Sequence, residues 1–166
     1  MIVIGIDPGT RITGYGIIQL EGPRSYIPLD YGCIRPPATM KLSDKYFAIF
    51  TGINMLLEKY HPTALAVETQ YVQKNPQSAL KLGMARGTVL IAARQRDIPV
   101  FEYSPTKAKQ AVVGNGRASK IQVQRMVQLL LHLSSVPQPE DAADALALAI
   151  CHSQATQYHK KYGNEI

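Results

Sequence analysis

The stretch IVIGIDPGTRITGYG, residues 2–16, decides the start of the fold. Residues 2–7 form a short apolar run, rich in β-branched side chains and ending in Asp7, which is typical of a buried strand. Pro8 and Gly9 break this run and indicate a turn that extends to residue 14. Apolar residues resume at Tyr15 and predict a second strand over 15–21. The chain therefore begins with two strands joined by a short connection.

The rest of the chain adds a third strand and then alternates helices with strands. A turn at Gly22 and Pro23 leads into a strand predicted over 25–35, which completes an antiparallel meander. Apolar spacing and capping signals predict the later elements: helices over 42–60, 78–96 and 119–133, strands over 64–69 and 100–104, a short helix and a glycine loop over 105–119, and a final helix opened by Pro139. A meander followed by right-handed crossovers gives an α/β fold, with a mixed five-stranded sheet flanked by helices.

The composition is that of a single globular domain. The chain has 166 residues, of which 46% are hydrophobic, enough for one sizeable core. We expect a domain over 1–155 and a mobile C-terminal tail over 156–166. Cys33 and Cys151 form no metal-binding pair, and free thiols fit a cytoplasmic protein. We expect neither a signal peptide nor a membrane-spanning segment.

The charge is basic and unevenly distributed. The net charge of +6 and the pI of about 9.4 suggest a polyanionic partner, with nucleic acid ahead of a membrane surface. No acid lies between Glu68 and Asp97, or between Glu102 and Glu140. The cations of these stretches are Lys74, Lys81, Arg86, Arg94, Arg96, Lys107, Lys109, Arg117, Lys120 and Arg125. One such stretch could be a solvated helix face, but two favour a basic surface.

Four carboxylates are candidates for a metal site. Asp7 and Glu68 end two predicted buried strands, where a charge is costly unless it is paired or bound to metal. Asp141 and Asp144 stand three apart in the apolar stretch PEDAADALALAICH, residues 139–152, and so share one helix face. If the two strands are neighbours, all four carboxylates meet. Such hard oxygen ligands call for Mg²⁺ or Mn²⁺, and two ions about 3.5–4 Å apart can promote phosphodiester hydrolysis.

Some of these acidic residues also have a simpler explanation. Glu140 and Asp141 lie in the first helical turn, where acids favour the helix dipole; we prefer this explanation for Glu140 and give it equal weight for Asp141. Asp144 lies further into the helix, where this explanation weakens. Asp7 could be a turn former before Pro8. The combination of four is more specific than any one of them.

Four blocks of the sequence closely resemble one family. GIDPGTRITGYG, VETQYVQKNPQSALKLGMARG, KQAVVGNGRASK and DAADALALAI resemble, in the same order, the RuvC family of Holliday junction resolvases. The resemblance runs from residue 2 to about 152. It implies a ribonuclease H-like fold and a homodimer. It also implies Mg²⁺-dependent cutting of four-way DNA junctions in recombination and repair, beside a branch-migration complex of the RuvA and RuvB kind.

The resemblance also assigns residues. The family's acidic quartet would fall on Asp7, Glu68, Asp141 and Asp144, of which the third is histidine in some members. Its basic residues near the active site would fall on Lys109 and Lys120. Its junction-wedging aromatic, usually phenylalanine, would fall on Tyr71, which keeps a stacking ring but adds a hydroxyl. Beyond these, we assign DNA contacts to the basic residues Lys74, Lys107, Arg117 and Arg125.

Two other classes of function are considered. IGIDPGT also resembles the first phosphate loop of actin-like kinases and chaperone ATPases, but those proteins need a second such loop and a second domain. A basic nucleic-acid-binding module without catalysis would leave the carboxylate at the end of ALAVE unexplained. We therefore favour the metal-dependent nuclease.

The helix over 78–96 is a candidate dimer interface. Its apolar residues point all round the axis, which indicates burial on more than one side. Gly83 and Gly87, four apart and near Leu90, would allow a partner backbone to approach closely. A helix sandwiched within its own domain is the alternative. Because a four-way junction is nearly two-fold symmetric, we expect a homodimer with two matched sites.

Overall fold

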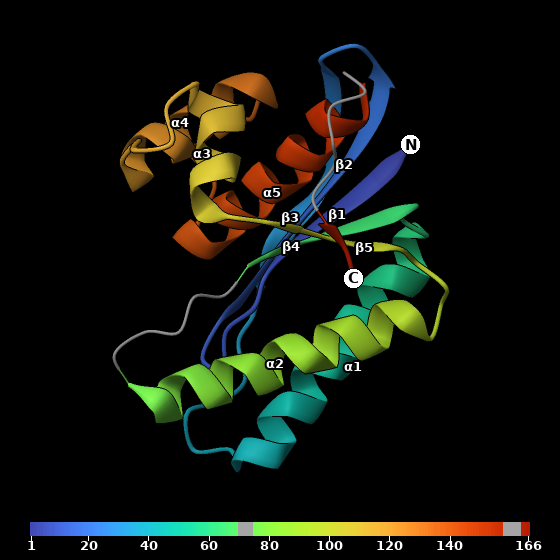
Figure 1. Ribbon diagram of the computed structural model, residues 1–166, viewed down its shortest axis with the longest axis vertical. Helices are drawn as coiled ribbons and strands as arrows, with labels where there is room; N and C mark the ends of the chain where they lie inside the picture. The colour runs from blue at the N-terminus through green and yellow to red at the C-terminus, as the bar shows by residue number, and fades with distance from the viewer. Residues whose placement is uncertain (70–74, 158–163) are drawn as a thin grey trace.

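A single mixed sheet, with helices on both faces, organises the chain in the computed structural model (Figure 1). The structure describes residues 1–69, 75–157 and 164–166. The strand order is β3-β2-β1-β4-β5-β6. The strands are β1 (Ile2–Asp7), β2 (Thr13–Gly22), β3 (Ser25–Ile34), β4 (Ala64–Glu68), β5 (Val100–Tyr103) and β6 (Asn164–Glu165).

The strand directions follow the predicted topology. The first three strands pair antiparallel, whereas β1 pairs parallel with β4 and β4 pairs parallel with β5. The five expected strands are therefore confirmed. The sheet gains a short sixth strand, β6, which pairs antiparallel with β5. It comes from the segment expected to be a mobile tail.

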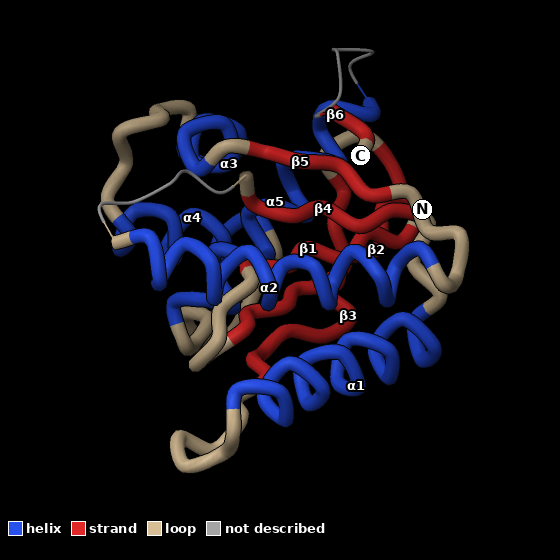
Figure 2. Tube along the Cα trace, turned by 60° about the horizontal axis from the view of Figure 1, so that its bottom comes forward, coloured by secondary structure: helices blue, strands red, loops and turns tan. Residues whose placement is uncertain are grey.

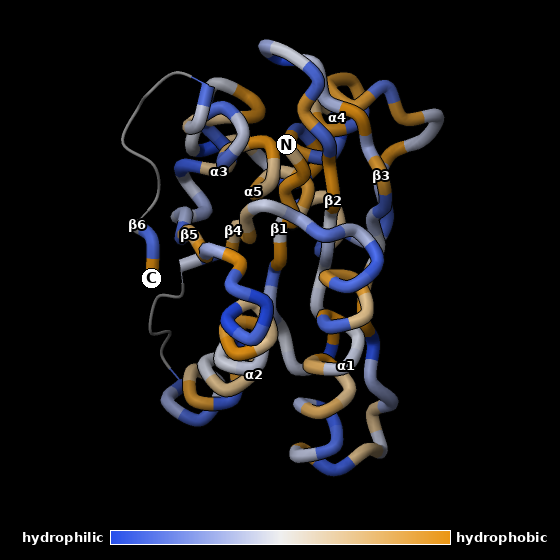
Figure 3. Tube along the Cα trace, turned by 90° about the vertical axis from the view of Figure 1, so that its right-hand side faces the viewer, coloured by the Kyte–Doolittle hydropathy of each residue, from blue (hydrophilic) through white to orange (hydrophobic). Residues whose placement is uncertain are grey.

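The helices form two layers that enclose the sheet (Figure 2). Two of them cover one face: α1 (Leu42–Tyr60) and α2 (Pro76–Arg94). The other face carries α3 (Pro105–Val113), α4 (Lys120–Leu130) and α5 (Glu140–Gln157). Apolar residues concentrate on the central strands (Figure 3), where Ile4, Ile6, Leu65 and Val67 are fully buried against the first layer. This two-sided burial explains why β1 and β4 have almost continuous apolar sequences.

Helix boundaries differ from the predictions where capping decides them. α2 begins at Pro76, two residues early, because the Asn75 side chain accepts hydrogen bonds from the backbone N–H groups of Gln77 and Ser78. The predicted capping box of Ser119 and Gln122 is present at the start of α4. That helix ends at Leu130 rather than 133. In the described ranges, no helix is long and apolar enough to span a membrane.

Three strand glycines let α5 rest directly on the sheet. A Cβ atom at Gly5 would lie 1.9 Å from the Ala145 carbonyl oxygen, and one at Gly14 would lie 2.1 Å from the Asp141 carbonyl oxygen. At Gly16 it would lie 2.6 Å from the Leu146 side chain. Only glycine therefore permits this approach of helix to strand. The contact fixes both the distance of α5 from the sheet and its position over β1 and β2.

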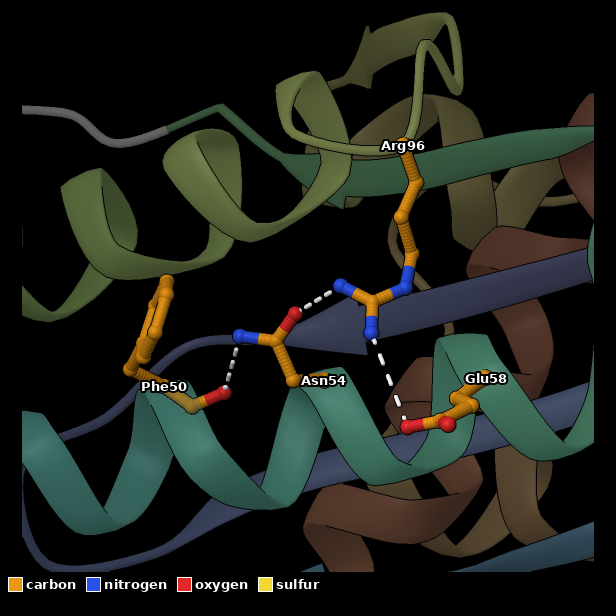
Figure 4. A network of polar contacts seen from close by, with 4 residues as sticks. All are labelled: Phe50, Asn54, Glu58 and Arg96. Atoms are coloured by element: carbon orange, nitrogen blue, oxygen red, sulfur yellow. Dashed lines mark hydrogen bonds and ion pairs between the residues drawn. The ribbon is translucent and has the colours of Figure 1, made fainter.

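A polar network joins the two helices of the opposite face (Figure 4). Arg96, which follows α2, donates a hydrogen bond to the Asn54 side chain of α1, and its Nη2 lies 3.7 Å from Glu58 Oε2. The Asn54 amide in turn donates to the Phe50 carbonyl oxygen at 3.0 Å. The network connects the end of α2 to the middle of α1.

The glycine contact yields a test of the fold. Replacing Gly5 with alanine places a methyl group inside contact distance of the α5 backbone, so the helix must lift or the strand must bend. Overpacking of this kind costs about 1–3 kcal/mol or more. We expect Gly5→Ala to lower the free energy of unfolding, measured by urea denaturation, by at least that amount.

Gly22→Ala is the matched control. A Cβ there would meet nothing closer than the Ser25 side chain at 4.0 Å, an ordinary contact distance. Its unfolding free energy should stay close to that of the unmodified protein. Equal stability of the two variants would show that α5 does not depend on the absence of a side chain at Gly5.

Candidate active site

Two parallel strands bring Asp7 and Glu68 to the same edge of the sheet. Ile6 of β1 is in register with Val67 of β4, so the carboxylates that follow them emerge side by side. Tyr103 of β5 lies in register with Glu68 on its other side. The condition on which the predicted site depended, that these two strands are neighbours, is therefore met.

The N-terminal turns of α5 bring Asp141 and Asp144 to this edge. The Asp141 backbone packs on Gly14, which is itself the cross-strand partner of Asp7. Asp144 lies about one helical turn further on and interacts electrostatically with Asp7 and with Glu68. The helix thus aims both aspartates at the ends of β1 and β4, which explains why so apolar a segment carries them.

Burial and mutual repulsion make these carboxylates hard to ionise. The pKa of Asp7 is raised to about 8, first by burial and then by the negative charges of Glu68, Asp144 and Asp141. Burial, and then Asp144, raise the pKa of Glu68. Burial is also the main cause of the raised pKa of Asp144. A site that disfavours its own negative charge favours an added cation.

Two lysines lie at the rim of the carboxylate cluster. Lys109 of α3 and Lys120 of α4 both act to lower the pKa values of Glu68 and Asp144, against the larger effect of burial. The Lys120 ammonium also donates a hydrogen bond to Glu140 at 2.9 Å, the main cause of its own raised pKa. Both predicted lysines therefore face the same cluster.

The donor set fits a hard divalent cation by its chemistry. It consists of carboxylate oxygens, and no hydrogen bond or ion pair joins Asp7, Glu68 or Asp144 to another side chain among the residues that the structure describes. In the same part of the chain, no three acidic, histidine or cysteine side chains already converge on one point. The fit therefore depends on buried carboxyl groups that have no side-chain partner rather than on preformed coordination.

The other predicted DNA contacts are distributed around this edge. The Lys107 ammonium lies 5.2 Å from the centre of the Tyr103 ring, next to the end of β5. Arg117 is exposed in the loop before α4, where its backbone N–H donates to Asn115, and Arg125 is exposed on α4. Tyr71 and Lys74 lie outside the described residues.

The predicted dimer residues lie on the opposite layer, away from the carboxylates. A Cβ at Gly83 or Gly87 would meet no atom within 4 Å. Leu90 is half-buried. On the same helix Leu80, Met84 and Ile91 are 67%, 48% and 58% exposed. The two glycines therefore face open space, and the helix is not sandwiched on this side by the described part of its own chain.

Two features of the site were not predicted from the sequence. Glu140 was explained by the helix dipole, yet it also holds the Lys120 ammonium. The glycines that seat α5 were not recognised as packing positions. Glycines two apart in a strand, at 14 and 16, were the available signal, because they lie on one face and mark a close approach.

Comparisons with known proteins agree with this geometry. The sequence model of the family described as crossover junction endodeoxyribonuclease RuvC matches residues 3–152. The crossover junction endodeoxyribonuclease RuvC of Protochlamydia amoebophila is 63% identical over 154 residues, which cover 93% of this chain and 91% of that protein. The Chlamydia pneumoniae protein of the same name is 50% identical over 158 residues and 94% of each chain.

Solved structures of Holliday junction resolvases are also similar to this chain. The RuvC of T. thermophilus, in complex with a Holliday junction substrate, superposes with a TM-score of 0.93 at 32% identity and covers 100% of this chain and 99% of its own. The yeast mitochondrial Holliday junction resolvase superposes with a TM-score of 0.66 at 18% identity, covering 95% of this chain and 80% of its own, which shows a shared fold.

The raised pKa of Asp7 predicts how stability depends on pH. The pKa of Asp7 rises from 3.8 to about 8 on folding. Between these values the unfolded chain loses the Asp7 proton while the folded chain keeps it, so the free energy of unfolding is highest below pH 4 and falls as the pH rises to about 8. Asp7→Asn removes this loss. In chelator at pH 8 we expect the variant to exceed the unmodified protein in unfolding free energy, by on the order of a few kcal/mol. The difference should shrink toward pH 4.

The effect of Mg²⁺ on the free energy of unfolding tests whether these carboxylates bind a cation. Adding Mg²⁺ at pH 8 should stabilise the unmodified protein, because a cation bound only by the folded state raises stability. It should do so much less for Asp7→Asn. Asp44→Asn, at an exposed aspartate of α1, should show neither effect. Urea midpoints of the unmodified protein that do not respond to Mg²⁺ would contradict a cation site at these carboxylates.

Proposed function

The chain belongs to the RuvC family of crossover junction endodeoxyribonucleases, and from this premise we propose that it resolves four-way DNA junctions by paired, symmetric cuts in recombination and repair. The observation that carries the proposal is the group of buried carboxylates at the ends of β1 and β4, faced by α5 and edged by lysines. Such a group in a basic chain suits hydrolysis of a phosphodiester. The family match supports neither the ATPase nor the non-catalytic module.

Asp7, Glu68, Asp141 and Asp144 are the proposed ligands of Mg²⁺, with two ions in each site and Mn²⁺ as a substitute ion. When bound, the ions supply an activated water and stabilise the leaving oxygen. Three of the four carboxylates have raised pKa values, which supports their role as ligands. Asp141 retains its alternative role in the first turn of α5.

The two lysines are proposed to hold the scissile phosphate. Lys109 and Lys120 approach the cluster from α3 and α4, on the layer that carries α5. An ammonium there can position the phosphate and offset its developing charge. Glu140 keeps Lys120 close to the first turn of α5 through their 2.9 Å contact. A phosphate that recruits Lys120 therefore competes with Glu140 for it.

The remaining basic residues are proposed to contact the junction arms. Lys107, Arg117 and Arg125 occupy the α3–α4 side of the site, and Lys74 is assigned to the same role from its sequence position. Tyr71, three residues after Glu68, is proposed to stack on a base opened at the crossover. Contacts to the phosphate backbone should weaken with added salt.

We also propose that two copies pair through the outer face of α2. Leu80, Met84, Gly87 and Ile91 recur at helical spacing along one stripe, on which the three apolar side chains are exposed and Gly87 is half-buried. Gly83 lies beside the stripe. On the neighbouring α1, Phe47 and Met55 are 70% and 65% exposed. An isologous pair built on this face would supply the two sites that paired cutting needs.

The setting of the reaction follows from its substrate. We propose that the protein works in the cytoplasm, where its two free cysteines stay reduced. There it would act beside a branch-migration complex of RuvA and RuvB, which presents the junction for cutting.

Glu68→Gln tests the catalytic assignment. The amide keeps the shape of the side chain but removes a charge that the metal site requires. We expect cleavage of a synthetic four-way junction in Mg²⁺ to be abolished, because loss of one ligand from a two-metal site displaces an ion, while binding in chelator is kept. Asp7→Asn and Asp144→Asn should behave alike, and Asp141→Asn should lose less.

Glu21→Gln, at an exposed residue of β2, serves as the matched control and should cut normally. Cleavage near the unmodified rate in Glu68→Gln would remove Glu68 from the site.

Gly87→Glu tests the interface. The new side chain has open space within its own chain, so the fold should persist, but it would place a charge in the middle of the apolar stripe. We expect sedimentation at micromolar concentration to change from dimer to monomer, and paired cuts in one junction to become single nicks. Gln110→Glu adds the same charge at an exposed position of α3, in the other helix layer, and should remain a dimer. Paired cutting by a monomer would contradict the interface.

A further inference from the structure

A basic groove, which the sequence did not indicate, lies on the β3 side of the active-site edge. It is formed by the loop after β1, the segment after β3 and the first turns of α1. Its lining residues are Arg11, Ile12, Arg35, Pro36, Pro37, Ala38 and Lys45. None of them has a role in the proposed cluster of carboxylates or in the α3–α4 basic surface.

Local hydrogen bonds hold the walls of this groove in place. The Thr13 hydroxyl donates to the Gly9 carbonyl oxygen at 2.8 Å and accepts from the Gly9 N–H at 3.2 Å, which closes the loop that carries Arg11. Thr13 pairs with Ile34, so Arg35 follows directly beside this loop. The Lys45 ammonium donates to the Ala38 carbonyl oxygen at 2.9 Å. The groove is thus a built feature that presents two arginines together.

The charge of the groove is positive and unneutralised. No acid lies between Asp30 and Asp44 in the sequence. Asp44 belongs to the first turn of α1, where its carboxylate accepts from Ser43 at 3.4 Å. Among the side chains that the structure describes, none forms an ion pair or hydrogen bond with the guanidinium of Arg11 or Arg35. Both arginines are exposed and free to bind an anion.

The position of the groove relates it to the carboxylates. β1 and β3 run in the same direction on either side of β2, so the loops after them share the edge that carries Asp7. Two strand spacings separate β3 from β1, roughly 10 Å. Lys109 and Lys120 approach from helices of the other layer. A backbone that crosses the carboxylates could therefore extend into the groove.

We propose that Arg11 and Arg35 bind phosphates of a DNA strand on the β3 side of the scissile bond. Planar guanidinium groups suit phosphate oxygens. The floor of Ile12, Pro36 and Pro37 offers no side-chain donor for reading base edges, so the contact is to backbone and independent of sequence. The inference rests on the proposed function, because it takes the DNA that the carboxylates cut as the ligand.

Arg11→Ala combined with Arg35→Ala tests the groove. Binding of a labelled four-way junction is measured in chelator by fluorescence anisotropy over a range of KCl concentrations. Each lost phosphate contact lowers the slope of log K against log salt by about 0.9. We expect the double variant to lose between one and two units of slope and to bind about tenfold or more weakly near 0.1 M salt. A linear duplex should show a loss of the same sign.

Two controls isolate the contact from net charge and from folding. Arg94→Ala removes an exposed arginine at the far end of α2, paired with Asp97, and should leave the slope unchanged. Arg11→Lys with Arg35→Lys keeps both charges and should retain most of the slope. An unchanged slope in the double alanine variant, or an equal loss of slope in Arg94→Ala, would overturn the proposal. The slope would also stay unchanged if the groove bound an acidic protein segment instead of DNA.

Cleavage separates this inference from the proposed function. If the unmodified protein binds the junction but does not cut it in Mg²⁺, the proposed function fails while the groove can still be judged by its salt slope. If the double alanine variant binds normally but cuts slowly, the arginines act on catalysis rather than on binding and the groove proposal fails.

Discussion

The close contact between α5 and the glycines of β1 and β2 is the constraint on which the site depends. Gly5, Gly14 and Gly16 remove the side chains that would keep a helix at its usual distance from a sheet. The small residues of α5 complete the contact from the other side, since Ala142, Ala145 and Ala149 are fully buried. Because α5 lies so close to the sheet, the carboxylates on its first turns lie near the strand ends. At the usual distance between a helix and a sheet, these carboxylates would lie further from the strand ends.

The cluster created by this contact is electrostatically unfavourable by itself. Burial and like charge both raise the pKa of Asp7, and nearby lysines compensate only in part. A fold can retain such a group when the remainder of the core supplies enough stability. Here fully buried side chains on both faces of the sheet do so, with Ile4 and Leu65 on one side and Val127 and Leu146 on the other. A buried group of like charges of this kind favours an added cation.

Much of this arrangement could be predicted from the sequence. β-branched runs located the central strands, helical spacing placed α1 from 42 to 60 as observed, and chain order placed Asp7 beside Glu68. These features depend on local pattern and on the handedness of crossovers. The proximity of Asp141 and Asp144 to Asp7 also followed, once the last helix was assumed to lie on the sheet.

Other features depend on contacts between distant residues, which local pattern does not encode. The pairing of Lys120 with Glu140 joins two helices across twenty residues. The groove arginines, Arg11 and Arg35, each stand alone among uncharged neighbours in sequence and come together only because β2 returns beside β1 and β3. The strand β6 was missed because two residues carry no periodic signal.

That short strand has a consequence for the behaviour of the sheet as a surface. An exposed strand edge is a template on which another chain can add, and it promotes aggregation. On one side the ten residues of β3 form the edge, where Pro28 lacks a donor and the pairing with β2 shifts register twice. On the other side β6 covers part of β5. The two borders of the sheet are therefore protected against strand addition by different means.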